Sequence, residues 1–292
     1  MRKYYSFIFL LFFITPLFSQ NKVDVIDLKK TEAEMKDLGI LILNSKSEEE
    51  KYKANERFIS ILEKTISEPA SFAYPFDSLS TIARLMAPDN SFRIFNWHIQ
   101  KEDGTFEYFG YIQPNPTLKN KKSNKDFYKL NDTKELASLE NKSFSANEWP
   151  GAHYYKLIHV KDKKNKYYTL LGWDGNNAYS TKKIVDVLHF TSNGEPKFGA
   201  PIFRMEKKMQ KRVIFEYAKD ATMSLNYNEK DETIIFDHLS PNNQKLKGQY
   251  QFYGPDFSFD ALLYKKGIWI FQPDINAKNI KSKKDKNWNK PE

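Results

Sequence analysis

The hydrophobic pattern divides the chain into a helical beginning and a strand-rich remainder. Apolar positions recur at helical spacing over residues 28–66. Two capping boxes fall in this stretch, Thr31 with Glu34 and Ser47 with Glu50, and each predicts the start of a helix. We therefore predict two helices here, with the second ended by a proline at position 69.

A shorter third helix is predicted over residues 78–86. Leu79, Ile82 and Leu85 recur there every three residues, before Pro88 stops the pattern. All three helices would have an apolar face to bury.

From residue 91 onward β-branched and aromatic residues gather in short runs separated by polar clusters, which is typical of strands. A shorter run at 127–130 and a short helix near Leu136 are also predicted. Because the links are mostly short, consecutive strands should be antiparallel neighbours. The predicted fold is mainly β with N-terminal helices (α+β), a large antiparallel β-meander packed with helices. The main predicted strands are residues 92–99, 105–112, 154–160, 167–173, 183–190, 212–217, 222–227, 233–239, 257–264 and 268–271.

One predicted strand has apolar residues on both sides. Phe106, Tyr108 and Ile112 point one way along the strand, while Phe109 and Tyr111 point the other. This strand should therefore be covered on both faces, with the N-terminal helices as one cover.

The first residues have the pattern of a secretory signal peptide. Arg2 and Lys3 precede an apolar run over residues 7–18, and Ser19 is the small residue before Gln20. We expect four segments: a signal peptide over 1–19, a helical section over 20–90, an antiparallel β domain over 91–276, and a disordered, lysine-rich tail over 277–292. The expected location is the periplasm or the extracellular medium, with no transmembrane segment after signal cleavage.

Composition narrows the chemistry. The chain has no cysteine, which excludes disulfides, thiolate metal sites, cysteine nucleophiles and a cysteine-linked lipid anchor. Its formal net charge is +9, of which the predicted signal segment carries two. For an exported chain this mildly basic balance favours an envelope glycan or another anionic envelope component as partner, not nucleic acid.

The chain contains no zinc-protease helix motif, nucleophile elbow, phosphate-binding glycine loop or dinucleotide fingerprint. Its densest polar string is Trp173, Asp174, Gly175, Asn176 and Asn177, which leaves a predicted strand. One interpretation is a binding site, with the tryptophan as a platform for a sugar ring and the oxygens of Asp174 and Asn176 as sugar or calcium ligands. The other is turn chemistry, because Asp-Gly and Asn-Asn bond their own backbone amides.

A second candidate is the adjacent pair Asp237 and His238. Neighbouring strand residues point to opposite faces, so these two cannot form a dyad with each other. Pairing across the sheet with Asp186 or His189 is one alternative, and a structural hydrogen bond is the other.

Several strings are specific enough to indicate a family. Together they resemble a family of uncharacterised exported proteins of Bacteroidota-type bacteria, over roughly residues 154–276. The resemblance implies an envelope setting and no activity, and it assigns no functional residue. The strings are LLGWDGNN at 170–177, KFGAPIF at 197–203, RVIFEYAKDA at 212–221, IFDHLSP at 235–241 and QYQFYGPD at 249–256.

The functional hypothesis is an exported, soluble, non-catalytic binding or structural protein of the cell envelope, without a resident cofactor or metal apart from calcium at the Asp174 loop. The alternative is a carboxylate-dependent hydrolase of glycans or peptides, with Asp174, Asp186 and Asp237 as the candidate acids.

The signal-peptide prediction has a direct test. We expect the mature protein to begin near Gln20, because cleavage should follow the small residue Ser19. N-terminal sequencing of the protein from an envelope or culture fraction checks this, and a mature chain that still begins at Met1 contradicts it.

Overall fold

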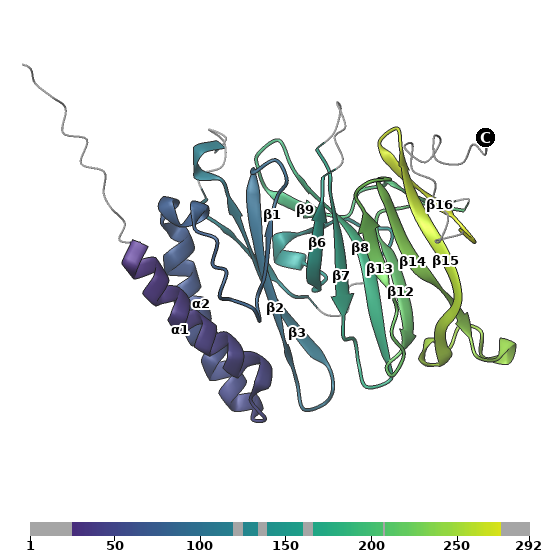
Figure 1. Cartoon of the computed structure of the whole chain (residues 1–292), viewed down its shortest axis with the longest axis horizontal. Helices are drawn as coiled ribbons and strands as arrows, with labels where there is room; N and C mark the ends of the chain where they lie inside the picture. Colours follow the sequence, from purple (N-terminus) through teal and green to yellow (C-terminus); the bar gives the residue numbers. More distant parts are fainter. Residues whose placement is uncertain (1–24, 119–124, 134–138, 160–165, 207, 276–292) are drawn as a thin grey trace, which may run out of the picture.

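The computed structural model describes residues 25–118, 125–133, 139–159, 166–206 and 208–275. The predicted signal peptide, the predicted tail and the short helix near Leu136 lie outside the described residues. The described elements follow one another along the long axis of the molecule, from helices α1 and α2 at one end to strands β15 and β16 at the other (Figure 1).

Two helices form where the spacing predicts them, α1 over Val25–Asn44 and α2 over Glu48–Ser67. The side chain of Ser47 accepts a hydrogen bond from the Glu50 amide at 3.3 Å, which confirms the second cap. The first predicted cap is wrong. Thr31 lies inside α1, which begins six residues earlier at Val25, and Glu34 instead pairs with Arg57 of α2 at 3.0 Å.

The third predicted helix is also wrong. Its last residues form the strand β1, Ala83–Met86, which pairs antiparallel with β2, Phe92–Gln100. Leu79 and Ile82 are buried. Their spacing therefore reflects burial and not helical structure. A short isolated helix is marginal in water, whereas pairing with β2 satisfies the same backbone groups.

The first sheet has the order β1-β2-β3-β4, with β3 over Phe106–Pro114 and β4 over Tyr128–Asn131. Both faces of β3 are covered, as the alternation predicts. Tyr111, with Phe109 beside it, packs under α1 and α2, while Phe106, Tyr108 and Ile112 belong to a second core.

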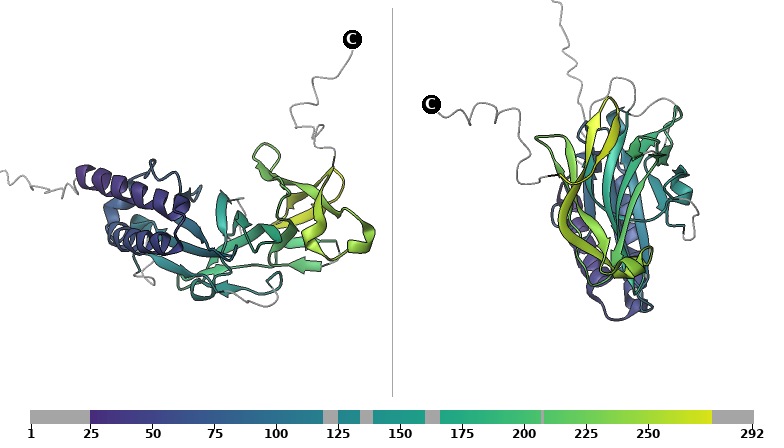
Figure 2. Two further views of the ribbon diagram at one scale, coloured as in Figure 1. Left: turned by 90° about the horizontal axis from the view of Figure 1, so that it is seen from below. Right: turned by 90° about the vertical axis from the view of Figure 1, so that its right-hand side faces the viewer.

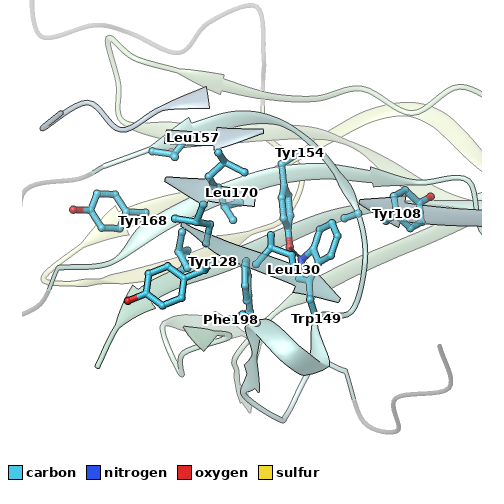
Figure 3. Close-up of a cluster of buried hydrophobic side chains, with 14 of the residues drawn as sticks. Tyr108, Tyr128, Leu130, Trp149, Tyr154, Leu157, Tyr168, Leu170 and Phe198 are labelled. Atoms are coloured by element: carbon cyan, nitrogen blue, oxygen red, sulfur yellow. Dashed lines mark hydrogen bonds between the residues drawn. The ribbon is translucent and has the colours of Figure 1, made fainter. Parts of the chain in front are cut away.

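The central sheet provides the other side of that second core. Its path is β5-β9-β8-β7-β6, and β12 shares the edge of β8 with β9. In Figure 3 Trp149, Tyr154 and Phe198 lie together within this core, and the Trp149 indole N–H donates to the Tyr154 hydroxyl at 3.3 Å. The strands are β5 (Phe144–Ser145), β6 (His153–Ile158), β7 (Tyr168–Asp174), β8 (Ser180–Phe190), β9 (Pro196–Phe198) and β12 (Val213–Ala218).

The terminal sheet has the order β11-β10-β16-β15-β14-β13 and packs on the central sheet through a third core. All its pairings are antiparallel except β10 with β16. Helices, first sheet, central sheet and terminal sheet thus form successive layers (Figures 1 and 2). The strands are β10 (Phe203–Met205), β11 (Lys208–Gln210), β13 (Leu225–Asn228), β14 (Thr233–Pro241), β15 (Tyr253–Lys265) and β16 (Ile268–Gln272).

The mainly β class with N-terminal helices is confirmed, and each predicted strand has a counterpart among the described strands. A single large meander is not confirmed, because the strands are divided among three sheets. The sequence pattern also missed β5, β9, β10 and β11, which have two or three residues each and are too short for a period to show. Among the described residues, no helix combines the length and the apolar character needed to cross a membrane.

A buried ion pair joins elements of the central sheet. Arg212 Nε lies 2.9 Å from Asp186 Oδ2, and both side chains are almost completely buried. The two groups are close enough for an ion pair, but the Nε–H group is not aligned for a hydrogen bond. Nη1 of the same guanidinium donates a hydrogen bond to the Leu139 carbonyl at 2.5 Å. The Tyr154 hydroxyl donates to Asp186 at 2.9 Å, and the Val187 amide donates to it at 2.7 Å. Asp186 therefore depends on three separate partners for its buried charge.

Replacing Arg212 by Met should destabilise the protein by about 3–5 kcal/mol, because it leaves the buried Asp186 carboxylate without its counter-charge. Urea denaturation of the two proteins measures the difference. Arg204→Met removes the same charge at an exposed position of β10 and should cost less than about 0.5 kcal/mol. Equal effects of the two substitutions would contradict the role of the pair.

Candidate functional site

The register of β7 and β8 divides the predicted site residues between two faces. Trp173 pairs with Lys183, and Asp174 pairs with Lys182. Successive strand residues point to opposite faces of a sheet, so the tryptophan and the aspartate adjoin in sequence without sharing a face. Trp173 and Asp174 therefore lie in different cross-strand rows.

Asp174 is held by a tyrosine of the first sheet. The Tyr108 hydroxyl donates to Asp174 Oδ1 at 2.8 Å and accepts from the Gly175 amide at 2.7 Å. The same carboxylate oxygen accepts from the Asn176 amide at 2.8 Å. Burial, together with the negative charge of Asp174, raises the pKa of the Tyr108 hydroxyl, so it stays protonated and keeps donating.

Asn176 has turn geometry and also bridges strands. Its φ is +53°, a left-handed conformation that asparagine tolerates better than most residues. Its amide nitrogen donates to the Ser180 hydroxyl at 2.7 Å and to Glu216 Oε1 at 3.2 Å, and its oxygen accepts from Lys182 Nζ at 2.9 Å. The loop after β7 is therefore tied to both β8 and β12.

Asn177 serves the turn itself. Its side-chain oxygen accepts from the amides of Tyr179 at 2.8 Å and Ser180 at 3.0 Å. This is the turn chemistry that was the alternative interpretation of the string, and it occupies the oxygen that a ligand would need.

A row of alternating charges crosses three strands on the face of Asp174. Asp174 pairs with Lys182, which in turn pairs with Glu216 of β12. Lys182 Nζ lies 4.0 Å from a carboxylate oxygen of each neighbour. The ammonium group thus lies between two carboxylates, and the row carries one more negative than positive charge.

A cleft of about 460 Å³ opens beside this row. The hairpin between β2 and β3, the loop after β7 and the segments near Asp132 and Gly151 form its walls, and Phe106 and Tyr108 supply the aromatic lining. Its lining residues are Lys101, Asp103, Thr105, Phe106, Tyr108, Asp132, Thr133, Leu139, Pro150, Gly151, Asp174, Asn176 and Lys182.

Asp132 connects the cleft to the same tyrosine. The Tyr108 backbone amide donates to Asp132 Oδ2 at 3.0 Å, so the residue contacts one carboxylate through its backbone and another through its hydroxyl. Gly151 lies against this pair with a φ of +52°, and a Cβ there would come within 2.4 Å of Asp132 Oδ1. A glycine is therefore required for the cleft wall to close onto the carboxylate.

Trp173 lies near two histidines. Its indole ring centroid is 5.2 Å from that of Phe106 and 5.3 Å from that of His98, and His98 and His153 are 5.2 Å apart. Burial lowers the pKa of His98 to about 4, so its imidazole is neutral at pH 7. Within the part of the chain that the structure describes, the Nδ1 atoms of both histidines are buried without a hydrogen-bond partner.

Within the described ranges, no group of three or more His, Asp or Glu side chains could hold a metal ion. The oxygens of Asp174 and Asn176 instead face the hydroxyl of Tyr108 and the ammonium group of Lys182.

The three acids of the hydrolase hypothesis lie in three different places. Asp174 lines the cleft, Asp186 is fully buried against Arg212, and Asp237 accepts a hydrogen bond from the Ser224 amide at 2.7 Å in the terminal sheet. No two of them share a cleft.

The second sequence candidate is a structural hydrogen bond. His238 Nδ1 lies 2.8 Å from Oδ2 of the buried Asp260 on the neighbouring strand β15, whereas Asp186 contacts Arg212 and Tyr154. This hydrogen bond raises the pKa of His238. The prediction of a structural bond is confirmed, although Asp260 was not named as the partner.

The sequence alone did not indicate Tyr108, Asp132 or Lys182 as part of the site. Alternation placed Tyr108 on an inward face, but its contact with Asp174 crosses 66 positions of sequence. The sequence indicates the charge row only weakly. Asp174 and Lys182 have opposite charges and flank a short loop, at the spacing of residues that pair across a hairpin.

Comparison with known proteins adds no assignment, since the sequence matches no known family and no curated protein. The resemblance to an exported family stays a prediction.

Asp174→Ala should lower the free energy of unfolding by about 1–3 kcal/mol, because the buried Tyr108 hydroxyl loses its acceptor and the loop loses its turn bond. The double variant Asp174→Ala/Tyr108→Phe should cost less than the sum of the two single variants, since each removes the same contact. Urea denaturation of all four proteins gives the coupling energy. Full additivity would mean that the two side chains do not interact.

Proposed function

We propose that this chain is an exported, non-catalytic binding protein of the cell envelope and that the cleft beside Asp174 holds a glycan. The observation that carries the proposal is the Tyr108–Asp174 contact, which orients a carboxylate in a cleft beside the ring of Phe106. Glycan sites combine an aromatic surface with polar groups held in place, because a sugar ring has apolar faces and an edge of hydroxyl groups.

The lining of the cleft suits hydroxyl groups. Asp103, Asp132 and Asp174 can accept hydrogen bonds from sugar hydroxyls, while Lys101 and Lys182 can donate. The cleft volume of about 460 Å³ lies within the usual range of roughly 300–1,000 Å³ for small-molecule sites. Since three carboxylates accompany two lysines, neutral and amino sugars are the preferred class.

Rigid elements support these groups. Asp103 accepts hydrogen bonds from the Thr105 amide at 2.8 Å and the Thr105 hydroxyl at 2.5 Å, which holds the β2–β3 hairpin in shape. Groups held in this way lose little freedom on binding, and this favours affinity. Export is supported by the signal-peptide pattern over residues 1–19.

One observation favours the hydrolase alternative in a changed form. Asp132 and Asp174 both line the cleft and both contact Tyr108, so they are the candidate acid pair among its three carboxylates. Release of reducing ends from a bound oligosaccharide, lost in Asp132→Asn, would support hydrolysis. Binding without any product supports the non-catalytic role.

Titration calorimetry with oligomers of N-acetylglucosamine, glucosamine and glucose tests the proposed function. We expect at least one of these oligomers to bind, and Asp174→Asn to weaken binding by about tenfold, because the amide loses the charge-assisted hydrogen bond while it can still accept from Tyr108.

Asp37→Asn is the matched control, since it removes the same charge from an exposed position on α1. It should leave affinity unchanged. The proposal fails if none of the three oligomers binds, or if Asp174→Asn binds as tightly as the wild type.

A further inference from the structure

The opposite face of the same strands carries an unbalanced positive charge. Lys183 of β8 pairs with Trp173 on β7 and with Phe215 on β12. By the same register its diagonal neighbours are Leu171 on one side and Val213 and Tyr217 on the other, all uncharged. In the neighbouring row Lys182 lies between the carboxylates of Asp174 and Glu216, whereas the row of Lys183 contains no carboxylate.

Lys183 lines a pocket of about 230 Å³ together with a second lysine, Lys219, and Trp173. We call this the basic pocket. Its remaining lining residues are Thr181, Tyr217, Ala221, Thr222 and Met223.

Neither lysine of the basic pocket has an acidic partner at ion-pair distance in the part of the chain that the structure describes. Lys183 Nζ lies over the ring of Tyr155, 4.7 Å from its centroid. Lys219 Nζ donates to the Gly175 carbonyl at 2.7 Å and lies 4.7 Å from the ring centroid of Phe106. Each ammonium group thus keeps N–H groups that these contacts do not use.

Both lysines are partly buried. Burial lowers the pKa of each, and at Lys219 the negative charge of Asp174 acts in the opposite direction. His153, which pairs with Trp173 on the other side, also has a lowered pKa, through burial and the charge of Lys183. Two half-buried ammonium groups in one concavity are costly alone and are stabilised by a negative ligand.

We propose that the basic pocket binds the carboxylate or phosphate group of an acidic sugar, with Lys183 and Lys219 as the charged contacts and Trp173 as the apolar wall. The pocket volume suits one charged group and part of a ring. This inference does not rest on the proposed glycan cleft, because Lys183 and Lys219 line the basic pocket and do not line that cleft.

Titration calorimetry with glucuronate, glycerol 3-phosphate and glucose tests the proposal. The first probe carries a carboxylate, the second a phosphate, and the third no charge. We expect glucuronate or glycerol 3-phosphate to bind in low salt, with affinity that falls as potassium chloride is added, and glucose not to bind to this pocket. Whichever anion binds more tightly identifies the charged group.

Lys183→Met and Lys219→Met should each weaken anion binding by about tenfold or more, because each removes a charge-assisted hydrogen bond. Lys183→Arg keeps the charge and should stay within about threefold of wild type. Lys156→Met is the matched control, since it removes a lysine that pairs with Glu229 outside the pocket, and it should change affinity by less than about twofold.

If Lys183→Met does not fold, as circular dichroism would show, Lys219→Met and Lys183→Arg still decide the question. The proposal is overturned if neither anion binds, or if Lys156→Met weakens binding as much as Lys219→Met does. A negative result with these anions would not change the outcome of the titrations with neutral oligomers at the Asp174 cleft. The two proposals are therefore separately testable.

Discussion

The antiparallel register of β7, β8 and β12 is the constraint on which both candidate sites depend. It aligns Asp174, Lys182 and Glu216 in one row and Trp173, Lys183 and Phe215 in the next. Because side chains alternate between faces, a shift by one residue would exchange the two rows. Asp174, Lys182 and Glu216 would then face the terminal sheet, and both the cleft beside Asp174 and the basic pocket would be lost.

The layered arrangement explains why polar groups inside the molecule have such specific partners. Each inner sheet is covered on both faces by hydrophobic cores, so a charge buried within one of these cores has no access to water. Asp186 is stabilised there by Arg212 and Tyr154, and Arg93 of the first sheet donates to Gln113 at 2.6 Å and to two backbone carbonyls. Charges that are less completely paired, such as those of Lys183 and Lys219, lie at the strand ends, where the cores stop and pockets open.

Residues whose environment is set locally were the most predictable. Ser47 caps its helix because the acceptor and donor are three positions apart, and the two faces of β3 follow from alternation alone. The segment before β1 shows where this reasoning fails. Leu79 and Ile82 repeat at a helical spacing, but burial in a turn also requires apolar residues, and periodicity over so few positions cannot separate the two cases.

The mainly β class, the positions of the principal strands and the absence of thiol chemistry could be predicted from the sequence, because they depend on composition and on neighbours a few positions apart. The turn role of Asn177 was one of two interpretations that the sequence left open. The division of the strands into three sheets, and the set of side chains that share a cavity, follow from the tertiary structure. Tyr108 reaches Asp174, and Trp173 lines a pocket with Lys219, through contacts between distant segments. Such contacts depend on how the sheets stack and on strand register, and a local pattern of polar and apolar residues carries no information about either.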